Sequence, residues 1–275
     1  MLMFRKTILI FAVLALSASG ILAQGSTITP GNLSKAEVDK IVARFTANEA
    51  AFREALTNYV FNRYATMHTI GLGGQITGTF RLDSFMTFTS DGKRFEKILF
   101  APMSTVSPGV ITREDLEDLG GVNPFALEPR MVSQYNFSYL GKEKIDDLNL
   151  HIFEVTPKAI PDPKSGVRLF TGRVWVDDED LMIVKSKGKA VPETKRNKFP
   201  VVETWRENVD GKYWFPALAL ADEQLVFDNG SVLHIKMNVK YTDYKMGRTD
   251  IIIGAEEDLP DEKPSPTPSP SPKKP

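Results

Sequence analysis

The chain has 275 residues, of which 42% are hydrophobic and 10% aromatic, so it can bury a substantial core in one domain. Its formal net charge of −1 argues against a general nucleic-acid partner, which needs a concentrated basic surface. There is no cysteine. Disulfides, thiolate catalysis, cysteine-held zinc and lipid attachment at a lipobox cysteine are therefore excluded.

The N-terminal segment has the order of a secretory signal. Two basic residues, Arg5 and Lys6, precede an apolar run that is followed by small residues. This order predicts a signal peptide over residues 1–23, cleaved after Ala23 or Gly20, and a periplasmic or secreted product. A transmembrane anchor is the alternative, because the uncharged run reaches the lower end of the length that a span needs.

A long helix is predicted from about residue 35 to 57. Ser34 and Glu37 form a capping-box pattern, and Leu33 and Val38 can form the hydrophobic staple beside it. Apolar residues then recur at helical spacing at Val38, Ile41, Val42, Phe45, Phe52 and Leu56. One apolar stripe of this kind is expected to pack on a sheet.

From Tyr59 the apolar period changes to two, which is typical of half-buried strands. Turn residues at Asp91-Gly92 and at 228–230 predict tight hairpins. Further strands are expected at 75–89, 95–101, 131–139, 201–207, 213–220, 224–227 and 231–244, with others between 137 and 187. A short capped helix is predicted at 112–119, ending at two glycines.

Two segments have an unusual composition. The predicted connection 185–198 carries six basic residues against one acid, so it is either a solvated loop or a contact for anionic lipid headgroups or an acidic partner. The last residues alternate proline with serine and threonine, which predicts an extended Pro-rich tail over 255–275. The globular domain is then expected to span residues 26–254.

No motif for catalysis is present. The chain lacks a nucleophile elbow, a phosphate-binding loop and an H-E-x-x-H zinc helix, and its three histidines fall inside predicted strands. The acidic run 177–180 sits on one predicted hairpin turn, without the loop of a calcium site. Trp175, Trp205 and Trp214 could stack on a sugar, but aromatic residues in strands belong more often to the core. We therefore expect no catalytic residue, no metal and no cofactor.

One stretch resembles a known family. It has the pattern G-x-E-x-I-D-x-L-x-L at 141–150, followed by R-V-W-V-D at 173–177, and G-K-Y-W-F-P occurs later at 211–216. These residues, and the order of elements over 35–245, resemble the outer-membrane lipoprotein-sorting family of LolA/LolB-like carriers. They are also similar to the lipid-sensing domain of the sigma-E regulator RseB. The resemblance implies a half-open barrel with a helical lid that holds acyl chains.

The expected fold is mainly β (α+β). It is an antiparallel half-open β-barrel of about ten strands, with the N-terminal helix and the short middle helix covering the concave face. A ten-stranded sheet is on the order of 45 Å wide. A helix is only about 10 to 12 Å across, so two helices leave part of the apolar face uncovered.

This uncovered face predicts a site for an acyl chain, and nine apolar residues are expected to line it: Ile76, Phe80, Leu82, Met86, Tyr135, Phe137, Leu233, Ile235 and Met237. The predicted function is an exported, monomeric carrier or sensor of a lipid or an acylated protein, without catalysis, with an envelope protein as a further partner. The alternatives are a secreted hydrolase of envelope lipid or glycan, and a structural or interaction module of the envelope.

Overall fold

The computed structural model describes residues 28–89, 93–107, 127–195 and 197–247. The helical elements are α1 (Lys35–Leu56) and two 3-10 turns, η1 (Pro129–Gln134) and η2 (Pro163–Ser165). The strands are β1 (Tyr59–Ile70), β2 (Ile76–Phe88), β3 (Arg94–Phe100), β4 (Tyr135–Ile145), β5 (Leu148–Pro157), β6 (Leu169–Asp177), β7 (Ile183–Val191), β8 (Val202–Val209), β9 (Tyr213–Val226) and β10 (Val232–Met246). No helix in the described ranges is long and apolar enough to cross a membrane.

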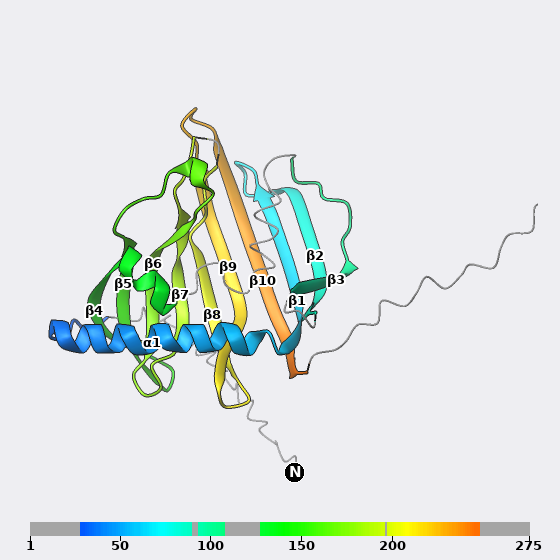
Figure 1. Cartoon of the computed structure of the whole chain (residues 1–275). Coiled ribbons are helices and arrows are strands. Elements are labelled where there is room, and N and C mark those ends of the chain that lie inside the picture. Colours follow the sequence, from blue (N-terminus) through cyan, green and yellow to red (C-terminus); the bar gives the residue numbers. More distant parts are fainter. Residues whose placement is uncertain (1–27, 90–92, 108–126, 196, 248–275) are drawn as a thin grey trace, which may run out of the picture.

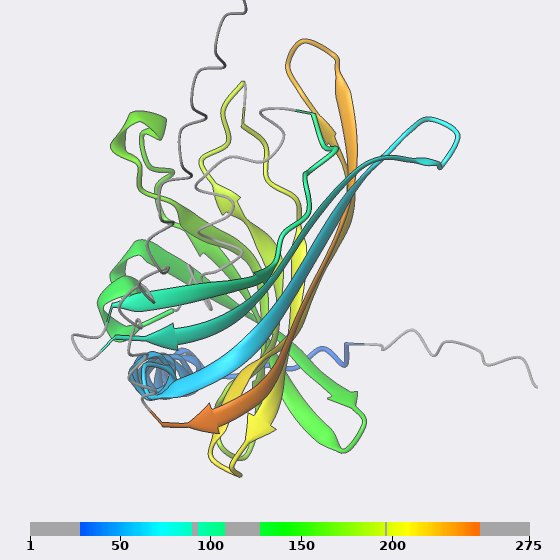
Figure 2. The same ribbon diagram turned by 90° about the vertical axis from the view of Figure 1, so that its right-hand side faces the viewer.

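All ten strands form one antiparallel sheet in the order β3-β2-β1-β10-β9-β8-β7-β6-β5-β4. The sheet curves around α1, which lies on its concave side, and β3 and β4 form its two edges (Figures 1 and 2). We call the concave side the inner face and the other side the outer face. This architecture confirms the predicted class, a mainly β fold with one open, curved sheet and an N-terminal helix.

Helix α1 begins where the sequence predicts. The Ser34 hydroxyl accepts a hydrogen bond from the Glu37 amide (3.3 Å), and the Ser34 amide donates to the Glu37 carboxylate (2.8 Å). This pair of bonds satisfies amide groups that the first helical turn leaves without partners. The capping box therefore fixes the start of the helix at Lys35.

Helix α1 crosses the strands (Figure 1), and its apolar stripe packs on the inner face. Its C-terminal half, through Phe52 and Leu56, packs on β1, β2, β9 and β10. Its N-terminal half, through Val42 and Phe45, packs on β4 to β7. Phe45 is 0% exposed, and its ring centroid lies 5.8 Å from those of Phe137 and Phe153. The helix thus joins the two halves of the sheet.

The two ends of the strands differ. Hairpins or connections at one end comprise residues 71–75, 158–168, 192–201 and 227–231, and we call this end the mouth. The other end, where β2 leads to β3 and where turns lie at 146–147, 178–182 and 210–212, is called the helix end, because α1 lies toward it (Figure 1). The hairpins of β1–β2 and β9–β10 project at the mouth in both views (Figure 2).

Three predicted boundaries were wrong. Residues 131–134 form η1 and not strand, because a turn starting at Pro129, which has no amide hydrogen, precedes β4. Strand β7 continues to Val191, so Lys185, Lys187 and Lys189 lie in a strand and not in a connection. The two strands expected at 213–227 are one, β9. The predicted signal peptide, the short helix at 112–119 and the Pro-rich tail lie outside the described residues.

We predict that Phe45→Ala lowers the free energy of unfolding by about 3 to 5 kcal/mol, because it removes a large and fully buried aromatic side chain. Arg44→Ala, at an exposed position of the same helix, is the control and should change stability by less than about 0.5 kcal/mol. Denaturant unfolding monitored by circular dichroism measures both. Equal unfolding curves for the two variants would show that α1 is not docked on the sheet.

Candidate functional site

The inner face carries three clusters of apolar side chains, and α1 covers two of them. The third contains no residue of α1 and lies on the mouth half of β1, β2, β9 and β10. We call it the mouth cluster; its members are Met67, Phe80, Leu225, Phe227, Leu233, Ile235 and Met237. Three of them are buried, and Phe80, Phe227, Leu233 and Met237 are partly exposed. The partly exposed side chains make this the candidate site.

Strand register assembles the mouth cluster. Met67 on β1 lies opposite Phe80 on β2 and opposite Met237 on β10. Leu233 on β10 lies opposite Leu225 on β9. Because directly opposed residues in an antiparallel pair point to the same face, these four strands present their apolar residues together.

The structure places four of the nine predicted residues in the mouth cluster: Phe80, Leu233, Ile235 and Met237. Sequence reasoning missed Met67, Leu225 and Phe227. The period-two pattern that starts at Tyr59 could have indicated Met67, since Ala65 and Thr69, two positions before and after it, are also buried.

The other five predicted residues lie elsewhere. Leu82 and Met86 are buried beneath the C-terminal half of α1. Ile76 is 58% exposed at the first position of β2, by the mouth. Tyr135 and Phe137 lie across the sheet on β4, where the Tyr135 hydroxyl accepts a hydrogen bond from the Phe170 amide (3.0 Å). The nine residues therefore do not form one continuous surface.

Tyr135 and Phe137 line a groove of about 900 Å³ between α1, η1 and the edge strand β4. Val38 and Val42 of α1 supply the apolar wall opposite them. Charged residues, among them Lys35, Asp39 and Lys158, also line the groove. This edge groove is a second place on the protein where an apolar chain could lie.

A buried ion pair fixes α1 over the sheet. Arg206 on β8 donates two hydrogen bonds to the Glu49 carboxylate of α1, Nη1 to Oε1 at 2.6 Å and Nη2 to Oε2 at 3.0 Å. Both side chains are nearly inaccessible (5% and 3% exposed), and the guanidinium also lies 4.6 Å from the centroid of the Phe52 ring. This two-pronged geometry sets the position and rotation of the helix along the sheet.

A second buried arginine lies on the inner face near β3. Arg63 on β1 is 0% exposed and pairs with Glu96 of β3 through Nη2, while its Nε and Nη1 have no hydrogen-bond partner among the described residues. Burial lowers the pKa of Arg63, and the negative charge of Glu96 opposes this shift. The inner face thus has a second strongly polar position, besides the Glu49–Arg206 pair, next to the apolar surface formed by Ala65 and Leu82.

Each of the three histidines contacts a neighbouring side chain. His68 contacts Thr79 on the outer face, His234 pairs with exposed Asp222, and His151 lies 3.3 Å from the hydroxyl of Tyr139. Burial lowers the pKa of His151. Within the described ranges, no group of three or more His, Cys, Asp or Glu residues is placed to hold a metal ion.

The tryptophans are engaged by neighbours. On the outer face, the Lys185 ammonium lies between Trp175 (4.8 Å to the ring centroid) and Trp205 (3.9 Å). The Trp175 indole donates to buried Glu143 (2.6 Å). Trp214 packs against the apolar cluster that contains Trp175, and its indole donates to Asp180 (3.1 Å). These contacts account for the three tryptophans as packing residues.

No protein-family model matches the chain, and no curated protein matches its sequence. Solved structures with a similar fold include a DUF1329 family protein from Desulfovibrio piger, 14% identical, with a TM-score of 0.39 over 75% of this chain and 92% of that one. A LolA superfamily protein from Nitrosomonas europaea is 12% identical, with a TM-score of 0.31 over 73% and 93%. MucB, also solved in complex with MucA(peri), is 10% identical, with a TM-score of 0.26 over 78% and 95%. The chain is thus structurally similar, at low sequence identity, to a LolA superfamily protein and to MucB, an RseB homologue, the groups that the sequence pattern resembles.

We predict that Arg206→Met alone destabilises the protein by about 3 to 5 kcal/mol, because it leaves the Glu49 carboxylate buried without its partner. The double variant Glu49→Leu, Arg206→Met should recover most of this loss, since no charge remains buried. A double-mutant cycle by denaturant unfolding, completed with Glu49→Leu, measures the coupling. Additive effects of the two substitutions would mean that the pair does not act as a unit.

Proposed function

We propose that this protein is an exported carrier or sensor that binds the acyl chain of a lipid or of an acylated protein on its inner face. One observation carries the proposal: the mouth cluster is an apolar surface of the inner face to which α1 contributes no residue. Each methylene of an acyl chain is stabilised by removal from water, and binding to a partly exposed apolar surface removes apolar area of both the chain and the protein from water. The described residues supply binding but no poised acid, base or metal ligand set, so no reaction is proposed.

The position of the cluster supports entry from the mouth. Phe80, Phe227 and Met237 are partly exposed, whereas the apolar residues beneath α1, such as Phe61 and Met86, are fully buried. A ligand that enters between the projecting hairpins meets the partly exposed side chains first. The buried ion pair between Glu49 and Arg206 holds the C-terminal half of α1 on the cluster toward the helix end of β1, β2, β9 and β10, so the ligand does not need to displace the helix to reach the mouth cluster.

The compartment and the partners belong to the same proposal. An acyl carrier or sensor of this kind would work in the periplasm or outside the cell, as the predicted signal peptide implies. Its partner would be an envelope protein that delivers, accepts or responds to the acyl group. Carrier and sensor would use one site, and they differ in whether the ligand is passed on or changes the binding of a partner.

We predict that delipidated protein binds a fluorescent fatty acid in solution and that Met237→Trp weakens this binding by about tenfold or more, because the indole fills the space beside Phe80 and Met67. Asn238→Trp places the same side chain on the outer face and is the matched control, with binding equal to wild type. Fluorescence titration gives the Kd, and thermal melting verifies that each variant is folded.

Ala43→Trp separates the mouth cluster from the edge groove, because Ala43 is exposed and lines only the groove. Binding that is lost in Ala43→Trp and kept in Met237→Trp would move the site to the groove. A wild-type protein that binds no fatty acid at all would contradict the proposed function.

A further inference from the structure

Exposed apolar side chains gather at the mouth. Of the twelve large apolar residues that are exposed in the described ranges, six lie in the mouth loops or at the strand ends beside them: Leu72, Ile76, Ile160, Val167, Val226 and Val232. The helix end has one, Met246. Leu72 is 109% exposed at the tip of the β1–β2 hairpin, so its whole side chain is offered to solvent. Exposed apolar groups concentrated on one end mark a surface that meets an apolar partner.

The two ends also differ in charge. Among the described residues, the mouth loops carry five basic residues (Lys158, Lys164, Arg168, Lys195 and Lys198) and three acids (Asp162, Glu193 and Asp228). The turns of the helix end carry six acids (Asp146, Asp147, Asp178, Glu179, Asp180 and Asp210) and two basic residues (Lys93 and Lys212). The described loops of the mouth are therefore net positive, and the described turns of the helix end are net negative.

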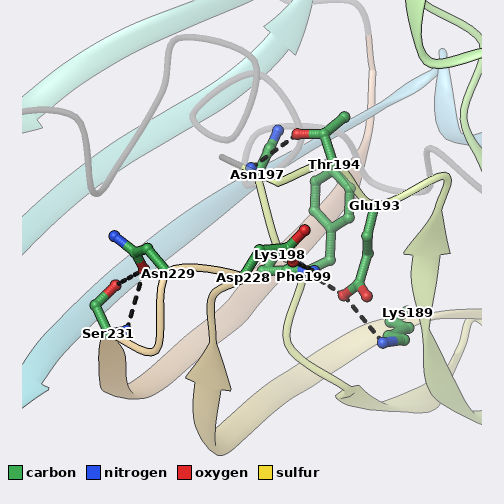
Figure 3. A network of polar contacts seen from close by, with 9 residues as sticks. All are labelled: Lys189, Glu193, Thr194, Asn197, Lys198, Phe199, Asp228, Asn229 and Ser231. Carbon is green, nitrogen blue, oxygen red and sulfur yellow. Dashed lines mark hydrogen bonds and ion pairs between the residues drawn. The ribbon is translucent and has the colours of Figure 1, made fainter.

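The acids of the mouth are already engaged within the protein. Glu193 accepts hydrogen bonds from the Lys189 ammonium (2.9 Å) and the Phe199 amide (3.1 Å), and Asp228 pairs with Lys198 (3.1 Å), as Figure 3 shows. Asp162 caps η2 by accepting from the Lys164 amide (2.8 Å). The bond between Lys198 and Asp228 joins the 192–201 connection to the β9–β10 turn (Figure 3), and the Arg168 guanidinium of the β5–β6 connection lies 4.8 Å from the centroid of the Phe199 ring. These three connections therefore contact one another at the mouth.

Three lysines of the mouth connections remain exposed: Lys158, which also lines the edge groove beside α1, Lys164 and Lys195. They come from the β5–β6 and β7–β8 connections, and the apolar tip at Leu72 comes from the β1–β2 hairpin. A surface that combines exposed lysines with protruding apolar side chains fits a layer of anionic headgroups above acyl chains. A protein partner would need an acidic rim around an apolar centre. An anionic bilayer has negative headgroups and apolar acyl chains over its whole surface.

We propose that the mouth is a docking surface for an anionic lipid bilayer. Leu72 and its apolar neighbours enter the headgroup layer, and the exposed lysines pair with lipid phosphates. The acidic helix end is repelled by the same surface, so the protein docks with its mouth toward the lipid. Docking of this kind does not require a ligand in the mouth cluster, but it would place that cluster beside the acyl chains that the proposed function needs.

The test is sedimentation with vesicles of phosphatidylcholine and phosphatidylglycerol. Wild type should bind, and Leu72→Asp should bind at least about tenfold more weakly, because a carboxylate at the hairpin tip is repelled by the headgroups. Met246→Asp is the matched control at the helix end and should bind as wild type does. Both termini of the chain are the same in all variants and cannot explain a difference between them.

A second pair of variants tests the charges. Lys164→Glu with Lys195→Glu should abolish binding to these vesicles, and Lys144→Glu with Lys212→Glu, an equal change of charge at exposed positions toward the helix end, should weaken it far less. Equal binding by the two double variants, equal binding by Leu72→Asp and Met246→Asp, or no binding by wild type would overturn the proposal. Titration of a fluorescent fatty acid without vesicles tests the proposed function separately, and Leu72→Asp should leave it unchanged.

Discussion

The width of the sheet is the constraint on which the rest of the structure depends. Ten strands at about 4.8 Å form a sheet on the order of 45 Å wide, and β10, with 15 residues, is about 50 Å long. Helix α1 has 22 residues, so it is about 33 Å long and about 10 to 12 Å across. It crosses the strands and can cover only a band of the inner face. Apolar side chains on the mouth half of the inner face therefore need partners other than α1, and the proposed acyl-chain site rests on this need.

The buried ion pair decides which band is covered. Two charges removed from water are costly unless they meet in good geometry, and the paired bonds between Glu49 and Arg206 provide it. The pair fixes where α1 lies along the sheet. Apolar packing alone does not specify this position, because an apolar stripe can slide along an apolar sheet. With α1 held toward the helix end, the mouth cluster stays outside its reach. The net positive loops and the exposed apolar tip of the β1–β2 hairpin lie at the mouth, as the mouth cluster does, so the two ends of the molecule differ in chemistry.

The parts of the fold that depend on local chemistry could be predicted from the sequence. The capping box at Ser34 and Glu37 gave the start of α1, and the period of two gave most strands. Residues 131–134 were misassigned because their apolar pattern is compatible with strand, whereas Pro129 starts a turn. Lys185 to Lys189 were placed in a connection because of their charge, but their alkyl chains and charges suit the outer face of β7.

The candidate site was only partly predictable, because its composition depends on register. Leu82 shares a face with Phe80, and only the placement of α1 buries it while Phe80 stays partly exposed. Glu49 and Arg206 are 157 residues apart, and no local pattern connects them. Met67 enters the site because it lies opposite both Phe80 and Met237.

The central claim is that the inner face at the mouth holds an acyl chain. Native mass spectrometry of protein purified without detergent from a membrane-containing host measures this directly, because a bound lipid adds its mass to the intact chain. The account predicts a lipid-bound species in wild type and in Asn238→Trp, and a lipid-free species in Met237→Trp. A wild-type spectrum with only the mass of the protein, or the same bound lipid in Met237→Trp, would contradict it.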